Sequence, residues 1–230
     1  MKTIKYALAA AVIMLAASCG KKDDPDPTPV PAAQVAKAMF VNGCINSGSL
    51  KVNMNNTAVA SVVGVDYLNN TAYLDVAPAS QVSVAYMLQP SNAKLSEVKQ
   101  DFAVNNYYSV FAAGIVTAPA MFVTVDDLSG PAAGMAKVRF VNLSPDNLNE
   151  SVFLGSNRID SNVTYREATA FIPVTAGTYK ITAQDPTNIP SVQILDQQVF
   201  TAGKIYTIIL TGTEGGSGNA ALSLKVIANN

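Results

Sequence analysis

The stretch AKVRFVN, residues 136–142, decides the fold because the chain contains it twice. Residues 36–42 read AKAMFVN, which differs at only two of the seven positions. A second matched set follows in each copy: Phe102, Tyr108 and Gly114, then Phe200, Tyr206 and Gly212. A repeat of about 100 residues has the length of a whole small domain. The sequence therefore predicts two tandem copies of one domain.

The repeat divides the chain into four predicted segments. A leader covers residues 1–18, and a lipidated cysteine with a flexible linker covers residues 19–34. The first and more diverged copy covers residues 35–130, and the second covers residues 131–230. The turn-forming residues Ser129, Gly130 and Pro131 mark the boundary between the copies.

The pattern within each copy is that of short strands. Residues 81–86 and 179–183 alternate between apolar and polar side chains, and turn residues recur about every 8 to 12 positions. No helical period is visible. About seven short strands per copy predict an all-β chain of two tandem antiparallel Ig-like β-sandwiches. Tyr108 and Tyr206 occupy matched positions just after a turn, which indicates a structural role like that of a tyrosine corner.

The second copy resembles the domain-of-unknown-function family 4397. The resemblance rests on residues 136–142, on the turn at residues 144–146, on Ala176-Gly177-Thr178-Tyr179 and on residues 202–207 with Gly212. The first copy departs from this pattern, with Gly43-Cys44-Ile45-Asn46 at the turn. The resemblance implies an extracellular Ig-like module and no established reaction.

The start of the chain predicts export and lipidation. Lys2 and Lys5 precede an apolar stretch over residues 6–17, which is shorter than the roughly 20 residues of a membrane span. Small residues then precede Cys19, as in the cleavage site of bacterial lipoproteins. The pattern predicts lipidation at Cys19, with acyl chains that anchor the protein to a membrane. An ordinary secretory signal with an unmodified Cys19 is the alternative.

The linker that follows contains a short charged cluster and then alternating prolines. Residues 21–24, KKDD, resemble the signal that sends lipoproteins of Bacteroidota-type bacteria to the outer face of the outer membrane. A solvated spacer facing the periplasm is the alternative. Prolines at positions 25, 27, 29 and 31 predict an extended spacer.

Composition excludes several classes of function. The chain has 15 basic and 16 acidic side chains, and removal of the leader takes away two basic ones, so we expect no nucleic-acid partner. There is no histidine, which excludes Ser-His and Cys-His catalysis and the usual zinc sites. Cys44 is the only cysteine besides Cys19, and we expect it to be buried and inert. Asp126 and Asp127 should point to opposite faces of a strand at a solvated junction. We expect no catalytic residue and no cofactor.

Binding candidates come from the loops and from unmatched aromatic residues. Asp146, Asn147 and Asn149 lie in one loop with Glu150, but the spacing and glycine of an EF-hand are missing, so we expect no metal there. Tyr86 and Tyr107 have no tyrosine at the matched positions and offer rings that stack on sugars or anchor proteins.

The sequence thus predicts a non-catalytic lipoprotein of the cell envelope that acts in binding, adhesion or as a scaffold, with a protein or glycan ligand. An accessory glycan-binding lipoprotein of an outer-membrane uptake system is one alternative, weakened by the absence of tryptophan. A pilin-like subunit is another, although both copies look complete.

Overall fold

The computed structural model describes residues 34–146, 149–185 and 188–230. The predicted leader, the lipidation site at Cys19 and the linker up to residue 33 lie outside these residues. Within the described part, no helix is long and apolar enough to cross a membrane.

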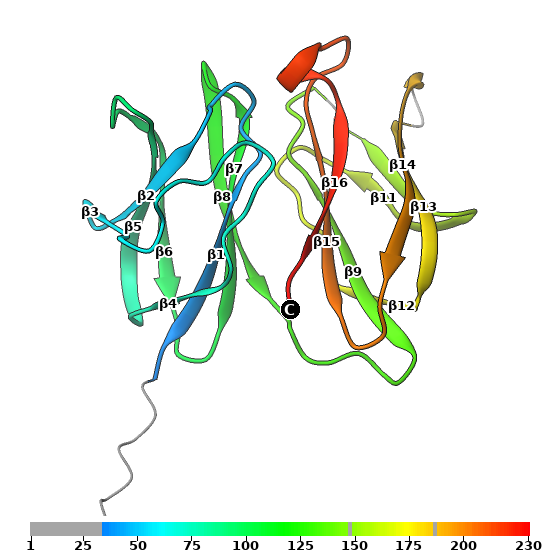
Figure 1. The fold of residues 1–230 in the computed structure, drawn as a ribbon, viewed down its shortest axis with the longest axis horizontal. Helices are drawn as coiled ribbons and strands as arrows, with labels where there is room; N and C mark the ends of the chain where they lie inside the picture. The colour runs from blue at the N-terminus through cyan, green and yellow to red at the C-terminus, as the bar shows by residue number, and fades with distance from the viewer. Residues whose placement is uncertain (1–33, 147–148, 186–187) are drawn as a thin grey trace, which may run out of the picture. The chain divides into compact units, whose positions relative to one another are not determined.

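The first copy folds into two four-stranded sheets (Figure 1). Its inner sheet, the one nearer the second copy, runs in the order β4 (Leu74–Val76), β1 (Ala36–Asn42), β7 (Tyr107–Ile115) and β8 (Ala118–Asp126). Its outer sheet runs in the order β3 (Thr57–Ala58), β2 (Leu50–Met54), β5 (Ala79–Leu88) and β6 (Lys94–Phe102). The two sheets form one sandwich.

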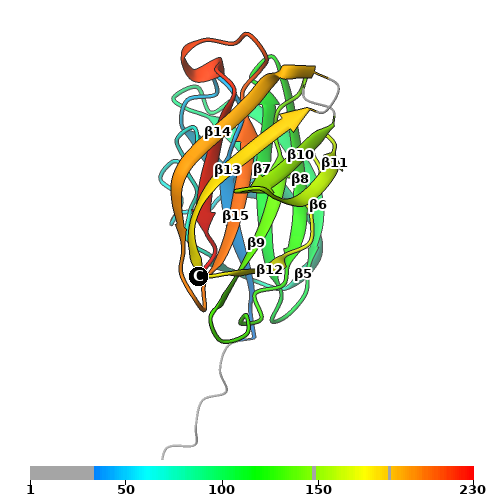
Figure 2. The ribbon, with the colours of Figure 1, turned by 90° about the vertical axis from the view of Figure 1, so that its right-hand side faces the viewer.

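The second copy repeats this order. Its inner sheet consists of β12 (Ile172–Thr175), β9 (Met135–Asn142), β15 (Ile205–Thr211) and β16 (Ser223–Ala228). Its outer sheet, which faces the viewer in Figure 2, consists of β11 (Asn157–Val163), β10 (Glu150–Leu154), β13 (Gly177–Asp185) and β14 (Asn188–Phe200). A 3-10 turn, Gly218–Ala220, lies between β15 and β16.

The repeated stretch that opens each copy forms the central strand of each inner sheet. β1 pairs in parallel with β7, with Phe40 opposite Val110, and β9 pairs in parallel with β15, with Phe140 opposite Ile208. The other pairings between strands are antiparallel. The two copies therefore match strand for strand.

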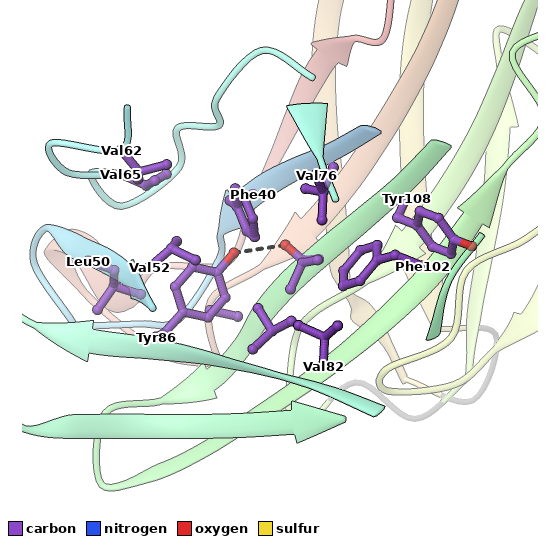
Figure 3. Packing of buried hydrophobic residues seen from close by; sticks show 14 of the residues in the cluster. Phe40, Leu50, Val52, Val62, Val65, Val76, Val82, Tyr86, Phe102 and Tyr108 are labelled. Atoms are coloured by element: carbon purple, nitrogen blue, oxygen red, sulfur yellow. Dashed lines mark hydrogen bonds between the residues drawn. The ribbon is translucent and has the colours of Figure 1, made fainter. Parts of the chain in front are cut away.

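Each sandwich encloses its own apolar core. Phe40, Val52 and Val110 belong to the first core, shown in Figure 3, and Phe140 and Ile208 belong to the second. Burying an aliphatic or aromatic side chain of this size contributes about 1.5–3 kcal/mol, so the cores hold the sheets together without a disulfide.

The predicted fold class of two tandem β-sandwiches is confirmed, with two differences in detail. Among the described residues each copy has eight strands instead of about seven, and in the first copy β3 and β4 are only two and three residues long and carry no alternation. Each copy also contains one parallel pair. The tyrosine roles are as predicted: the Tyr108 hydroxyl accepts the Ala103 N–H at 2.9 Å, and the Tyr206 hydroxyl accepts the Thr201 N–H at 3.1 Å.

Candidate functional site

The two inner sheets pack against each other through a third apolar cluster. Met39, Val41 and Phe111 come from the first sandwich, and Val141, Leu143, Ile209 and Ile227 from the second. The Thr211 hydroxyl also donates to the Gly43 carbonyl at 2.8 Å across the junction. Residues Gln34–Asn230 accordingly form one compact unit.

A buried ion pair lies at the edge of this junction. Arg139 Nη1 is 2.6 Å from Asp126 Oδ1, and the two side chains are 2% and 0% exposed. The guanidinium also donates to Ser109 Oγ at 3.0 Å and to Thr207 Oγ1 at 2.9 Å. Charges buried in this way need such partners to offset their lost hydration.

Further hydrogen bonds complete the environment of Asp126. Its Oδ2 accepts from Ser109 Oγ and from the Tyr73 hydroxyl, each at 2.5 Å. The Tyr73 hydroxyl in turn accepts from Asn229 Nδ2 at 2.9 Å. Burial and the Asp126 carboxylate raise the pKa of Tyr73, so Tyr73 stays a neutral donor. The network ties β8 of the first sandwich to the C-terminal end of the second.

The two copies carry different residues at the positions of the ion pair. Met39 stands where the second copy has Arg139, and Asn229 follows β16 where Asp126 ends β8. The Arg139 guanidinium also lies 4.4 Å from the centre of the Phe171 ring, which adds a cation–π contact. One charged pair therefore lies in this junction beside the apolar cluster.

This pair corrects the sequence-based interpretation of Asp126. The two aspartates do point to opposite faces, since Asp127 is exposed and bonds Lys137 Nζ at 3.0 Å. Asp126, however, is buried and belongs to the junction, not to a solvated boundary. Sequence reasoning missed Arg139 as its partner, although a single arginine inside the otherwise apolar run of residues 138–141 was the available signal.

Beside this network a groove of about 680 Å³ opens between β7, the end of β8 and the C-terminus. Its lining includes Asn105, Asn106, Tyr107, Asp127 and Asn230. The volume lies in the range of small-ligand sites, and amides, a carboxylate and one aromatic ring suit a polar, uncharged ligand. This groove is the candidate binding site that the geometry favours.

The two tyrosine candidates lie in different environments. Tyr107 is half-buried, lines the groove and packs edge-on against Tyr73 with ring centres 5.2 Å apart, so its binding role stays a prediction. Tyr86 is 0% exposed, and its hydroxyl donates to the Val41 and Val110 carbonyls. Figure 3 shows it inside the first core. The prediction that Tyr86 binds a ligand is wrong, because its ring cannot reach one.

The loop candidates lie at the start of β10. Asp146 is exposed, and its carboxylate accepts the Glu214 N–H at 3.0 Å and lies 3.1 Å from Ser144 Oγ. Asn149 is half-buried, and Asn147 lies outside the described residues. Their predicted binding role remains untested. Glu150, which follows them, is fully buried.

Nothing in the surroundings of Cys44 activates it. The thiol is buried as predicted, and burial raises its pKa to about 12, so the reactive thiolate is unavailable at neutral pH. Among the described residues, no group of three or more Cys, Asp or Glu side chains converges as a ready-made metal site.

Comparisons with known proteins identify the type of domain. The family model described as "Domain of unknown function (DUF4397)" matches residues 36–149 and 143–230. No curated protein matches the chain. A crystal structure from Bacteroides uniformis ATCC 8492, described provisionally as that of a cell adhesion protein, is 13% identical with a TM-score of 0.26, covering 85% of this chain and 99% of that one. Likeness at that level says nothing about what this chain binds.

Proposed function

Because the chain belongs to the DUF4397 family, which carries no assigned reaction, we propose its function from its own residues: it is a non-catalytic lipoprotein of the cell envelope that presents its two sandwiches as one binding or scaffold unit. The observation that carries this proposal is the junction. A third apolar cluster and the Arg139–Asp126 pair join two sandwiches that each have a core of their own.

A fixed junction matters for a binding module. Two domains on a loose linker lose freedom of motion relative to each other when a partner contacts both, and this entropic cost weakens binding. In a pair that is already packed together, the cost has been met before the partner binds. The groove beside the junction lies against residues of both copies, among them Tyr107 and Asn230. A partner in this groove would therefore contact both sandwiches together.

The cellular location in this proposal is inferred from the start of the sequence. Cys19 carries the lipid, residues 19–34 form the spacer, and β1 begins at Ala36. The outer face of the outer membrane is the proposed position, with the periplasmic face as the alternative.

Protease treatment of intact cells tests the address. A protease too large to cross the outer membrane should remove the signal of an antibody against the second sandwich while a periplasmic protein stays intact. A Cys19→Ala variant should appear in the soluble fraction. Protection of the wild type would place the domains in the periplasm and remove adhesion from consideration, and a membrane-bound Cys19→Ala variant would contradict lipid anchoring.

The groove supports a second candidate function, that of an accessory glycan-binding lipoprotein. The Tyr107 ring and the Asn105 and Asn106 amides are groups that stack on and hydrogen-bond sugars. Titration of soluble neutral oligosaccharides should then give binding that is lost in Tyr107→Ala and kept in Tyr179→Ala, whose ring lies in the second sandwich away from the groove. Equal binding by both variants would exclude this groove.

A further inference from the structure

A second hollow, of about 340 Å³, lies beside the groove. Its lining includes Arg139, Thr169 and Phe171 of the second sandwich together with the end of β8. Val125 and Asp127 line both the hollow and the groove, so the two cavities adjoin at the end of β8. Each volume lies within the range of small-ligand sites, and side by side they offer room for an elongated ligand.

Each of the two cavities carries a half-buried aromatic ring. Tyr107 lines the groove, and Phe171, which directly precedes β12, lines the hollow. Val125, which both cavities share, is 63% exposed and adds apolar surface to each. Flat rings with an exposed face stack on the apolar faces of sugar units. The adjoining cavities therefore offer two stacking positions, one from each sandwich.

A row of contacts fixes these two rings relative to each other. The Tyr107 ring packs against Tyr73, whose hydroxyl donates to Asp126. Asp126 pairs with Arg139, and the Arg139 guanidinium lies 4.4 Å from the centre of the Phe171 ring. Every member of this row is buried or half-buried, so the rings keep their spacing. A ligand that reaches both rings meets a site that is already formed, which lowers the cost of binding.

The charges around the two cavities favour a neutral ligand. Asp127 lines both cavities and is ionised at neutral pH, because hydrogen bonds from Ser129 and Lys137 lower its pKa to about 2. Arg139, in the lining of the hollow, is already held in the buried ion pair. An acidic ligand would therefore meet the charge of Asp127, whereas the exposed Asn105 amide both donates to and accepts from neutral hydroxyl groups.

Building on the candidate function of glycan binding, we propose that the groove and the hollow form one extended site for a chain of neutral sugar units. One unit stacks on Tyr107, and a unit further along the chain stacks on Phe171. Contacts at two linked positions bind more tightly than either alone, because the second contact forms within a molecule that is already bound. Affinity should therefore rise with the length of the oligosaccharide until the chain spans both rings.

Isothermal titration of the full chain, purified in detergent, tests this site with glucose, xylose and mannose oligosaccharides from the disaccharide to the hexasaccharide. In the series that binds, the wild type should hold the longest members at least about tenfold more tightly than the disaccharide. Phe171→Leu keeps an apolar side chain against Arg139, so it should bind the disaccharide like the wild type and lose the gain with length. Val125→Glu should also weaken the long members, whereas Val199→Glu, at a position 61% exposed on β14, should bind like the wild type.

The outcomes separate the extended site from glycan binding itself. Equal affinity for all lengths, with binding lost in Tyr107→Ala, would overturn the extended site and leave the groove as a glycan site. A gain with length that persists in Phe171→Leu, with its fold intact by circular dichroism, would place the second contact outside the hollow. If Phe171→Leu does not fold, Val125→Glu makes the same comparison at an exposed residue. Binding of none of these sugars would exclude glycan binding and the extended site together.

Discussion

Arg139 shows how one substitution between the two copies changes the chemistry of their junction. At the matched position the first copy has Met39, which packs into the apolar cluster with no need of a partner. Arg139 instead depends on Asp126, Ser109 and Thr207 for the hydrogen bonds that replace water. A pair of this kind adds little net stability over an apolar contact, but removing one partner leaves the other group buried without a counterion.

Arg139→Met should therefore destabilise the protein by about 3–5 kcal/mol, because it leaves Asp126 buried without its counterion. The double variant Arg139→Met, Asp126→Asn should recover more than half of that loss, since its residues match Met39 and Asn229 and leave no buried charge. Urea unfolding of both variants measures the difference. Equal losses in the single and double variants would show that the charge of Asp126 is not the cause.

Glu150 predicts an unusual pH dependence of stability. Burial, with smaller contributions from Asp185 and Glu214, raises its pKa to about 7 from an ordinary value of 4.5. The folded chain thus holds this proton more tightly than the unfolded chain, so stability is full below pH 4.5 and falls as the pH rises through 7. The shift corresponds to a loss of about 3 kcal/mol.

The difference between the wild type and Glu150→Leu isolates this effect from the other carboxylates. Urea unfolding from pH 4.5 to pH 8 should show the gap between the two proteins widening as the pH rises and levelling off above pH 7. A constant gap over that range would mean that Glu150 has an ordinary pKa in the folded protein.

At the scale of elements, the strands of the inner sheets are buried on both faces. In β1, Phe40 faces the first core while its neighbours Met39 and Val41 face the other sandwich, and β15 divides Ile208 and Ile209 in the same way. Strands covered on both sides read as nearly continuous apolar runs. The runs at residues 38–41 and 208–210 carried this signal, but periodicity alone predicts only that they are strands.

The turn after β15 depends on a residue without a side chain. Gly212 has a φ of +99°, and a Cβ there would lie 2.3 Å from the Ala221 carbonyl oxygen. Gly212→Ala should cost about 2–3 kcal/mol or more through backbone strain and this clash. Gly130→Ala, where nothing lies within 4 Å, should change the unfolding free energy by less than about 0.5 kcal/mol. Similar melting temperatures for the two variants would contradict this account.

At the scale of the whole molecule, the repeat in the sequence predicts two sandwiches but not how they meet. Their junction needs Arg139 from one copy and Asp126 from the other, two residues that nothing in their local sequence connects. Of the groove residues, the sequence pointed only to Tyr107. It pointed equally to Tyr86, a tyrosine in a similar strand, which lies in the core instead. Tertiary packing decides which residues of different strands face each other, and the alternation along a single strand does not encode it.

The junction should make the two sandwiches unfold together, and a charge placed in it should separate them. Ile209→Asp puts a carboxylate into the third cluster and leaves the second core untouched, because the neighbouring Ile208 faces that core. Calorimetry should then show two transitions in place of one, and a protease should cut the exposed link between β8 and β9. Ile208→Asp is the matched comparison, since it should unfold the second sandwich itself. A single transition and an uncut link in Ile209→Asp would mean that the sandwiches stay joined without this cluster, leaving the Arg139–Asp126 network to hold them.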